Sequence, residues 1–120
     1  MIFMEYTVIG VVVILVALRF MPSKGVKQIT TEELKNVLTD KNKQFIDVRT
    51  QGEYKANHIR EFENIPLNQL PQKTESLSKE KEVVVICQSG MRSSQASKQL
   101  KKSGFKSVTN VRGGMSAWRS

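Results

Sequence analysis

Cys87 is the only cysteine of the chain, and it directly follows four consecutive β-branched residues, 83–86. The residues after it are Gln88, Ser89, Gly90, Met91 and Arg92. Such a loop can turn successive backbone N–H groups inward, and a following helix adds the positive end of its dipole. These surroundings favour the thiolate, the nucleophilic form of cysteine. The pattern predicts covalent cysteine chemistry; the alternative is a buried structural cysteine that ends a hydrophobic strand.

Strands and helices alternate around this loop. Short apolar runs predict strands over 45–48, 83–86 and 108–111, and helical patterns occupy 31–39, 51–56 and 92–103, the last stopped by Gly104. Thr30 and Glu33 have the spacing of a capping box at the start of the first helix. The order indicates an α/β fold with a mainly parallel sheet.

The composition divides the chain into two unlike parts. Residues 1–21 contain 17 apolar residues, whereas residues 22–120 carry the whole net charge of +8. One cysteine excludes an intramolecular disulfide framework, and 120 residues suit a single ordinary domain.

The apolar end predicts a transmembrane anchor over 1–21, followed by a linker at 22–26 and a domain over 27–120. Residues 2–20 would form a helix about 28 Å long, close to the ~30 Å hydrocarbon thickness. No basic residue precedes the run and Arg19 closes it, which argues against a cleaved signal peptide. Arg19, Lys24 and Lys27 lie on the C-terminal side, so the positive-inside rule places the domain in the cytoplasm, on a single-pass cell-membrane protein. The alternative is a buried core helix or strand.

The sequence of residues 27–120 resembles the rhodanese-like family. The matching blocks are Phe45-Ile46-Asp47-Val48-Arg49, Glu53-Tyr54, His58-Ile59, Asn64-Ile65-Pro66-Leu67, the loop Cys87 to Arg92, and Val111-Arg112-Gly113-Gly114-Met115-Ser116-Ala117-Trp118. The order and spacing of these blocks together carry the resemblance. It implies a five-stranded, mainly parallel sheet flanked by helices.

The resemblance also implies a sulfurtransferase in which Cys87 is the catalytic residue. Cys87 would take sulfane sulfur from a donor such as thiosulfate or a persulfide, and the resulting Cys87 persulfide would pass it to a thiol or cyanide. Substrate binding would fall to Gln88, Ser89, Gly90, Met91 and Arg92. No metal or organic cofactor is implied, and the partners would be a small donor and a thiol acceptor or sulfur-carrier protein.

Two other functions compete with sulfur transfer. A cysteine phosphatase cradle needs five residues between Cys and Arg, and four stand between Cys87 and Arg92, which suits a sulfur atom better than a phosphoryl group. The second competitor is a non-catalytic protein-binding module of the same fold, tethered to the membrane. Asn57 and residues 60–62 depart from the family pattern and motivate it.

Several residues around the loop have supporting roles in this interpretation. Asp47 and Arg49 would organise neighbouring loops, with Glu53 as a partner for Arg49 or as a solvated helix residue. His58, the only histidine, matches a structural turn position. Gly113 and Gly114 would let the backbone pass close to the loop Cys87 to Arg92, named here the active loop, and Trp118 would pack against the domain.

Basic residues recur on or just after the helix that follows the active loop: Lys98, Lys101, Lys102 and Lys106. A solvated helix face is the ordinary explanation. The alternative is that this face and the basic residues near the anchor hold the domain to an anionic membrane. No groove-reading motif or aromatic-basic pattern is present, so no nucleic-acid partner is expected.

Overall fold

The computed structural model describes residues 2–20 and 25–119, with side chains described at 5–15 and 25–119. Its strands are β1 (Val26–Ile29), β2 (Lys43–Asp47), β3 (Glu63–Asn64), β4 (Glu82–Ile86) and β5 (Val108–Val111). Its helices are α1 (Ile2–Phe20), α2 (Thr31–Lys35), α3 (Gln51–Ala56), α4 (Leu70–Lys73), α5 (Met91–Lys102) and α6 (Gly114–Ala117). Two short 3₁₀ helices, η1 (Leu67–Gln69) and η2 (Thr74–Ser76), flank α4.

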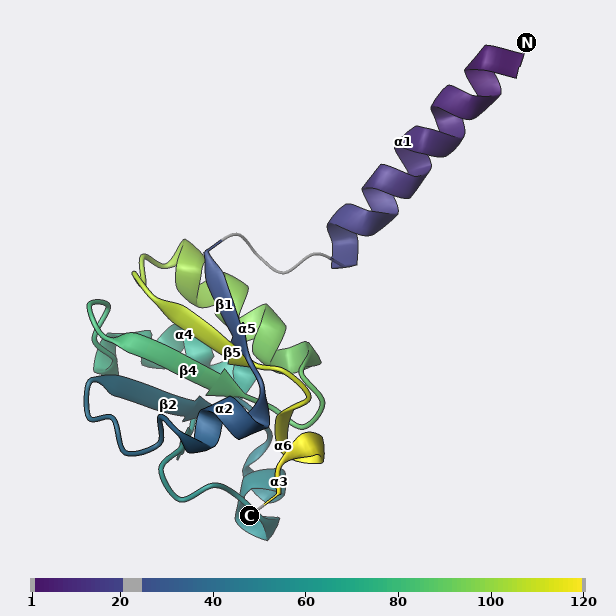
Figure 1. The fold of residues 1–120 in the computed structure, drawn as a ribbon. Coiled ribbons are helices and arrows are strands. Elements are labelled where there is room, and N and C mark those ends of the chain that lie inside the picture. The colour runs from purple at the N-terminus through teal and green to yellow at the C-terminus, as the bar shows by residue number, and fades with distance from the viewer. Residues whose placement is uncertain (1, 21–24, 120) are drawn as a thin grey trace.

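The five strands form one parallel sheet in the order β1-β5-β4-β2-β3 (Figure 1). The register pairs the first residues of neighbouring strands, such as Lys43 with Glu82. All strands therefore begin at one edge of the sheet and end at the opposite edge. The predicted fold, a five-stranded parallel sheet flanked by helices, is confirmed.

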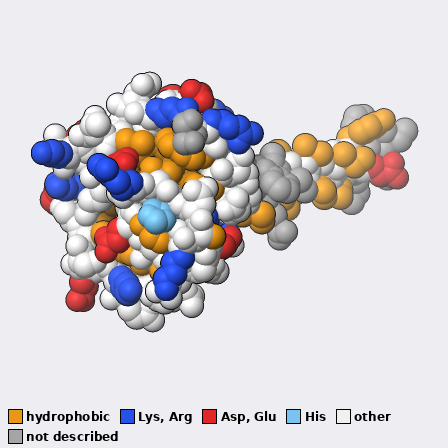
Figure 2. Space-filling view, turned by 90° about the horizontal axis from the view of Figure 1, so that it is seen from below, with side chains coloured by type: hydrophobic (Ala, Val, Ile, Leu, Met, Phe, Trp, Pro, Cys, Tyr) orange, Lys and Arg blue, Asp and Glu red, His pale blue; other side chains and the backbone are white. Residues whose placement is uncertain are grey.

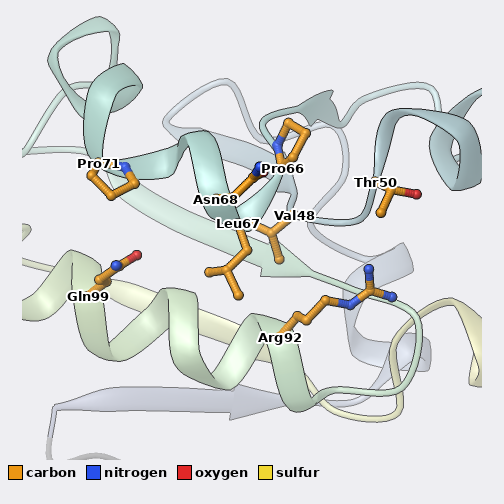
Figure 3. Close-up of a pocket in the computed structure, with 8 residues that line it drawn as sticks. All are labelled: Val48, Thr50, Pro66, Leu67, Asn68, Pro71, Arg92 and Gln99. Carbon is orange, nitrogen blue, oxygen red and sulfur yellow. The ribbon is translucent and has the colours of Figure 1, made fainter.

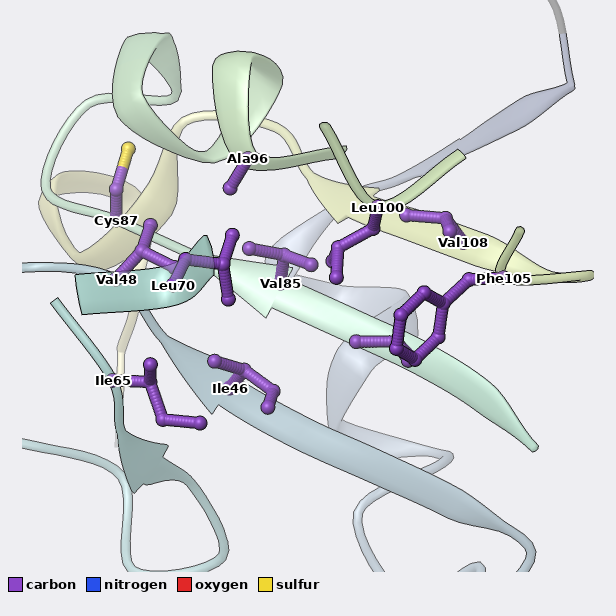
Figure 4. Packing of buried hydrophobic residues seen from close by; sticks show 11 residues of the cluster. Ile46, Val48, Ile65, Leu70, Val85, Cys87, Ala96, Leu100, Phe105 and Val108 are labelled. Carbon is purple, nitrogen blue, oxygen red and sulfur yellow. The ribbon is translucent and has the colours of Figure 1, made fainter. Parts of the chain in front are cut away.

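The sheet is covered on both faces, which explains why β4 is β-branched throughout. Val83 and Val85 pack on one face with Ala96 and Leu100 of α5 (Figure 4). Val84 and Ile86 pack on the other face, together with the α2 residue Leu34, the α6 residue Met115 and partly buried Trp118. A strand buried on both faces needs apolar residues at every position instead of every second one. The predicted packing of Trp118 is confirmed.

The N-terminal helix α1 stands apart from the sheet (Figure 1), and Figure 2 shows apolar side chains along it. Its described side chains are exposed, as in Val8 at 60% and Ile14 at 59%. This excludes the alternative of a helix or strand buried in the core. Within the described residues no helix is long and apolar enough to cross a membrane. The predicted linker residues 22–24, including Lys24, and the side chain of Arg19 lie outside the described part.

Local structure differs from the sequence prediction at three places. The helix predicted over 31–39 ends at Lys35, after one capped turn, and 36–39 form turns. The capping box of Thr30 and Glu33 is present as predicted. β1 and β3 were not predicted, and both form the outer strands of the sheet.

Candidate active site

Cys87 lies at the carboxyl end of β4, where the loop 87–90 leads into α5. Its side chain is fully buried, and the Gly90 N–H donates a hydrogen bond to the sulfur at 2.9 Å. The Ser93 hydroxyl oxygen lies 3.3 Å from the same sulfur. Gly90 caps α5 with a left-handed φ of 109°, which favours glycine, and no side-chain cap blocks the helix N-terminus. The sulfur therefore faces backbone N–H and the positive end of a helix dipole.

The start of α6 holds this loop from the other side. The N–H groups of Met115 and Ser116 donate to the carbonyls of Cys87 and Gln88 at 2.8 and 2.9 Å. A Cβ atom at Gly114, whose φ is 56°, would overlap the Cys87 carbonyl. These contacts occupy the carbonyl oxygens of Cys87 and Gln88 and fix the loop against α6. The expectation that Gly114 brings backbone close to the loop is confirmed.

Arg92 pairs with Glu53, which corrects both interpretations of Glu53, as a partner for Arg49 and as a solvated helix residue. The two guanidinium nitrogens of Arg92 donate to the two Glu53 carboxylate oxygens at 2.7 and 2.9 Å. The Arg92 side chain, with a hydrogen bond from the Thr50 N–H as a second cause, lowers the pKa of Glu53 to about 2. Glu53 in turn raises the pKa of Arg92 above its usual value. The cation beside the loop is therefore already paired with a carboxylate.

Arg49 is instead held by Asp47, and both side chains are buried. Its Nε and Nη2 donate to the Asp47 carboxylate at 2.8 to 3.1 Å. The same guanidinium donates to the Asn57 carbonyl at 2.7 Å and to the side-chain oxygen of Gln88 at 3.3 Å. Arg49 meets Glu53 only through that residue's backbone carbonyl. The pair thus connects the end of β2, the region after α3 and the active loop.

A groove of about 450 Å³ lies between α5 and the segment from Pro66 to Pro71 (Figure 3). Figure 3 shows Leu67 and Val48 between these two walls, with Arg92 at one end and Gln99 at the other. Asn68 adds an amide to the lining. Arg92 lines the groove and also ends the loop that begins at Cys87, so the groove leads toward the active loop.

The other predicted site residues lie around this centre in different environments. Ser89 and Met91 are exposed, Met91 at 76%. His58 is exposed as well, stacks on the Tyr54 ring with the ring centroids 3.8 Å apart, and forms a hydrogen bond with the Tyr54 carbonyl through Nδ1. Among the described residues no group of three or more His, Cys, Asp or Glu side chains could hold a metal ion.

The profile of the rhodanese-like domain family matches residues 30–120. The chain belongs to the rhodanese-like family. It is 44% identical over 94 residues to the Bacillus subtilis protein named "Putative sulfurtransferase YtwF", covering 78% of this chain and 90% of that protein. It is 36% identical over 97 residues to the B. subtilis protein named "Putative sulfur carrier protein YrkF", covering 80% of this chain and 52% of YrkF. The crystal structure of a rhodanese-like domain protein from Staphylococcus aureus superposes with a TM-score of 0.72 at 37% identity, covering 78% and 92% of the two chains.

Sequence reasoning missed two features of this rhodanese-like site. The first is the pairing of Glu53 with Arg92, across 39 positions of sequence. The second is Ser93, whose buried hydroxyl lies beside the sulfur and donates to the Gly90 carbonyl at 3.1 Å. The available signal for the second was the position of Ser93, six residues after Cys87 and in the first turn of the predicted helix.

Proposed function

We propose that the protein is a sulfurtransferase that carries sulfane sulfur as a Cys87 persulfide. The observation that carries this proposal is the placement of the Cys87 sulfur, 2.9 Å from the Gly90 N–H and next to the start of α5. Hydrogen-bond donors placed in this way stabilise negative charge on sulfur. The family membership, and relatives named sulfurtransferase and sulfur carrier, support the same chemistry.

The reaction would run in two displacement steps. In the first, the Cys87 thiolate attacks the outer sulfur of thiosulfate, a new S–S bond forms, and the old S–S bond breaks with its electron pair leaving on sulfite. In the second, an acceptor thiolate or cyanide attacks the outer sulfur and the Cys87 thiolate leaves. Gly90 would stabilise the anionic sulfur in both steps, and Arg92 would attract anionic donors along the groove. Gln88, Ser89 and Met91 would complete the substrate-binding loop, and no metal or cofactor is needed.

We propose further that α1 attaches the domain to the cell membrane, with the domain in the cytoplasm. The support is the exposed aliphatic surface of α1, as in Ile9 at 59% and Val13 at 60%, which finds no partner in the domain's two described cores. Such a surface is unfavourable in water and favourable in lipid. The protein should sediment with membranes and resist extraction by high salt. Release by salt alone would contradict the attachment.

The sulfur chemistry is tested by mass spectrometry of Cys87 in protein isolated without reductant and then incubated with thiosulfate. We expect one added sulfur atom on Cys87, its removal by cyanide as thiocyanate, and loss of both signals in Cys87→Ser. Failure of thiosulfate and of several organic persulfides to add sulfur would refute the proposal.

The competing function is a tethered protein-binding module, which the exposed Met91 beside the groove favours. The same Cys87→Ser variant separates the two functions. A cellular phenotype unchanged by this substitution would favour binding, and a lost phenotype would favour chemistry.

A further inference from the structure

Lysines gather at the edge of the sheet where the strands begin. Residues 40–43, 79–82 and 101–106, which lie before or at the first residue of β2, β4 and β5, contain seven lysines and three acidic residues. The lysines are Lys41, Lys43, Lys79, Lys81, Lys101, Lys102 and Lys106. Because the sheet is parallel, these three segments lie at the same edge, which we name the lysine edge.

Backbone and side-chain contacts join the three segments into one surface. The Lys106 N–H donates to the Lys79 carbonyl at 3.0 Å, and Lys101 Nζ donates to the Lys106 carbonyl at 3.2 Å. Lys81 Nζ donates to the Lys41 carbonyl at 3.3 Å, which joins the turns before β4 and β2. The lysines are therefore neighbours in space.

The acidic residues of the lysine edge neutralise only two of its lysines. Lys43 forms ion pairs with both Glu82, at 2.6 Å, and Asp40, at 3.6 Å. Lys106 takes Glu80 at 2.7 Å. In the described part of the chain, no ion pair is recorded for the remaining five: Lys41, Lys79, Lys81, Lys101 and Lys102. The edge thus keeps an excess positive charge.

The opposite edge, where Cys87 lies, has a different charge pattern. Beside Cys87, Arg49 and Arg92 are paired with Asp47 and Glu53, whereas Arg112, which follows β5, is exposed and forms no ion pair among the described residues. Figure 2, which views the molecule from the side of α3 and α6, shows blue and red side chains interspersed with apolar ones. Five lysines without an ion pair thus lie at the edge that does not carry the active loop.

The lysine edge is also where the N-terminal part of the chain joins the domain. Gly25, next to the first residue of β1, lies against the Lys101 side chain: a Cβ there would come within 2.9 Å of Lys101 Cε. The exposed aliphatic residues of α1 precede this junction. Apolar side chains followed by a cluster of unpaired lysines match the two layers of an anionic bilayer, hydrocarbon and phosphate headgroups.

We propose that the lysine edge docks on anionic lipid headgroups and thereby orients the domain with Cys87 facing away from the membrane. β4 has five residues, so the two edges are about 16 Å apart, more than the ~8 Å screening length at physiological salt. The headgroup charge would then leave the donor site almost unaffected. Donor and acceptor would reach Cys87 from the aqueous phase.

The test uses the full chain in a Cys87→Ser background, reconstituted with vesicles of phosphatidylcholine alone or containing phosphatidylglycerol. A fluorophore is placed on Asn42→Cys at the lysine edge or on Ala56→Cys in α3, and the vesicles carry a headgroup quencher. We expect strong quenching at Asn42→Cys only with phosphatidylglycerol, lost at high salt, and little quenching at Ala56→Cys. Both positions are exposed, so labelling leaves the core intact.

Two triple variants, each lacking three positive charges, test whether docking depends on the position of the charges or on the net charge of the protein. K79Q/K81Q/K101Q should abolish the lipid-dependent quenching at Asn42→Cys, whereas K35Q/K55Q/R60Q, which removes three exposed charges elsewhere, should retain it. Thermal unfolding of both variants checks the fold. Equal quenching with neutral lipid, equal effects of the two triple variants, stronger quenching at Ala56→Cys, or no association with anionic vesicles would each overturn the proposal. If the protein binds a single-stranded RNA through the same lysines and does not bind the vesicles, anionic lipid is not the partner and the proposal is overturned.

Discussion

Removing the charge of Glu53 should strengthen the binding of anionic donors. Glu53 holds Arg92 through two hydrogen bonds, at 2.7 and 2.9 Å, so an incoming anion meets a guanidinium that a carboxylate already neutralises. An anion on the outer side of Arg92 would lie roughly 6 Å from that carboxylate. At an effective dielectric constant of about 40 to 80, suited to a pair one-third exposed, the repulsion is about 0.7 to 1.4 kcal/mol per unit charge. For a dianion partly screened by salt, this corresponds to about tenfold in affinity.

Glu53→Gln is the appropriate variant because glutamine keeps one acceptor for Arg92 and still completes a capping box with Thr50. We expect its KM for thiosulfate to fall about tenfold at physiological ionic strength, and by about threefold for a singly charged persulfide. Protection of Cys87 from alkylation by sulfate should rise in parallel and needs no turnover. Glu61→Gln, an exposed change of the same charge, should alter neither value. An unchanged or raised KM in a folded Glu53→Gln protein would refute the reasoning and assign Glu53 to positioning Arg92.

Three further predictions concern stability. Asp47→Asn leaves the buried Arg49 guanidinium without its counter-ion and should cost about 3–5 kcal/mol in urea unfolding, so a loss below about 1 kcal/mol would contradict the pairing. Gly114→Ala should cost at least about 2 kcal/mol, because its Cβ would overlap backbone at a positive φ; Gly52→Ala, with open space around it, should be near neutral or stabilising. Folding lowers the pKa of Glu53 from 4.5 to about 2. Its contribution to the free energy of unfolding is therefore complete above about pH 4.5 and disappears as the pH approaches 2. Glu53→Gln should remove this pH dependence of the unfolding free energy between pH 4.5 and 2.

The predictable parts of the fold are those whose residue pattern is typical of a single kind of element. The residues before Cys87 are apolar at every position, which is the pattern of a central parallel strand, and β4 is that strand. β1 and β3 lie at the two ends of the sheet and pair on one side only. β3 has two residues, Glu63 and Asn64, too few for any periodicity to appear. The helix after Thr30 was predicted too long because Val37 and Leu38 keep a helical spacing although they lie in turns.

The Glu53 error shows what a local sequence interpretation leaves out. The sequence offered Arg49 as a partner for Glu53, with a solvated helix position as the alternative, but Arg49 is already held by Asp47, whose carboxylate is two residues away at the same strand end. Thr50 and Glu53 form a capping box, which fixes the Glu53 carboxylate at the start of α3. With Arg49 occupied, the Glu53 carboxylate pairs instead with Arg92 of the active loop. Assigning the buried Asp47–Arg49 pair first therefore leaves Glu53 for Arg92, and in the proposed sulfurtransferase Glu53 would be the carboxylate that limits how strongly Arg92 attracts anions.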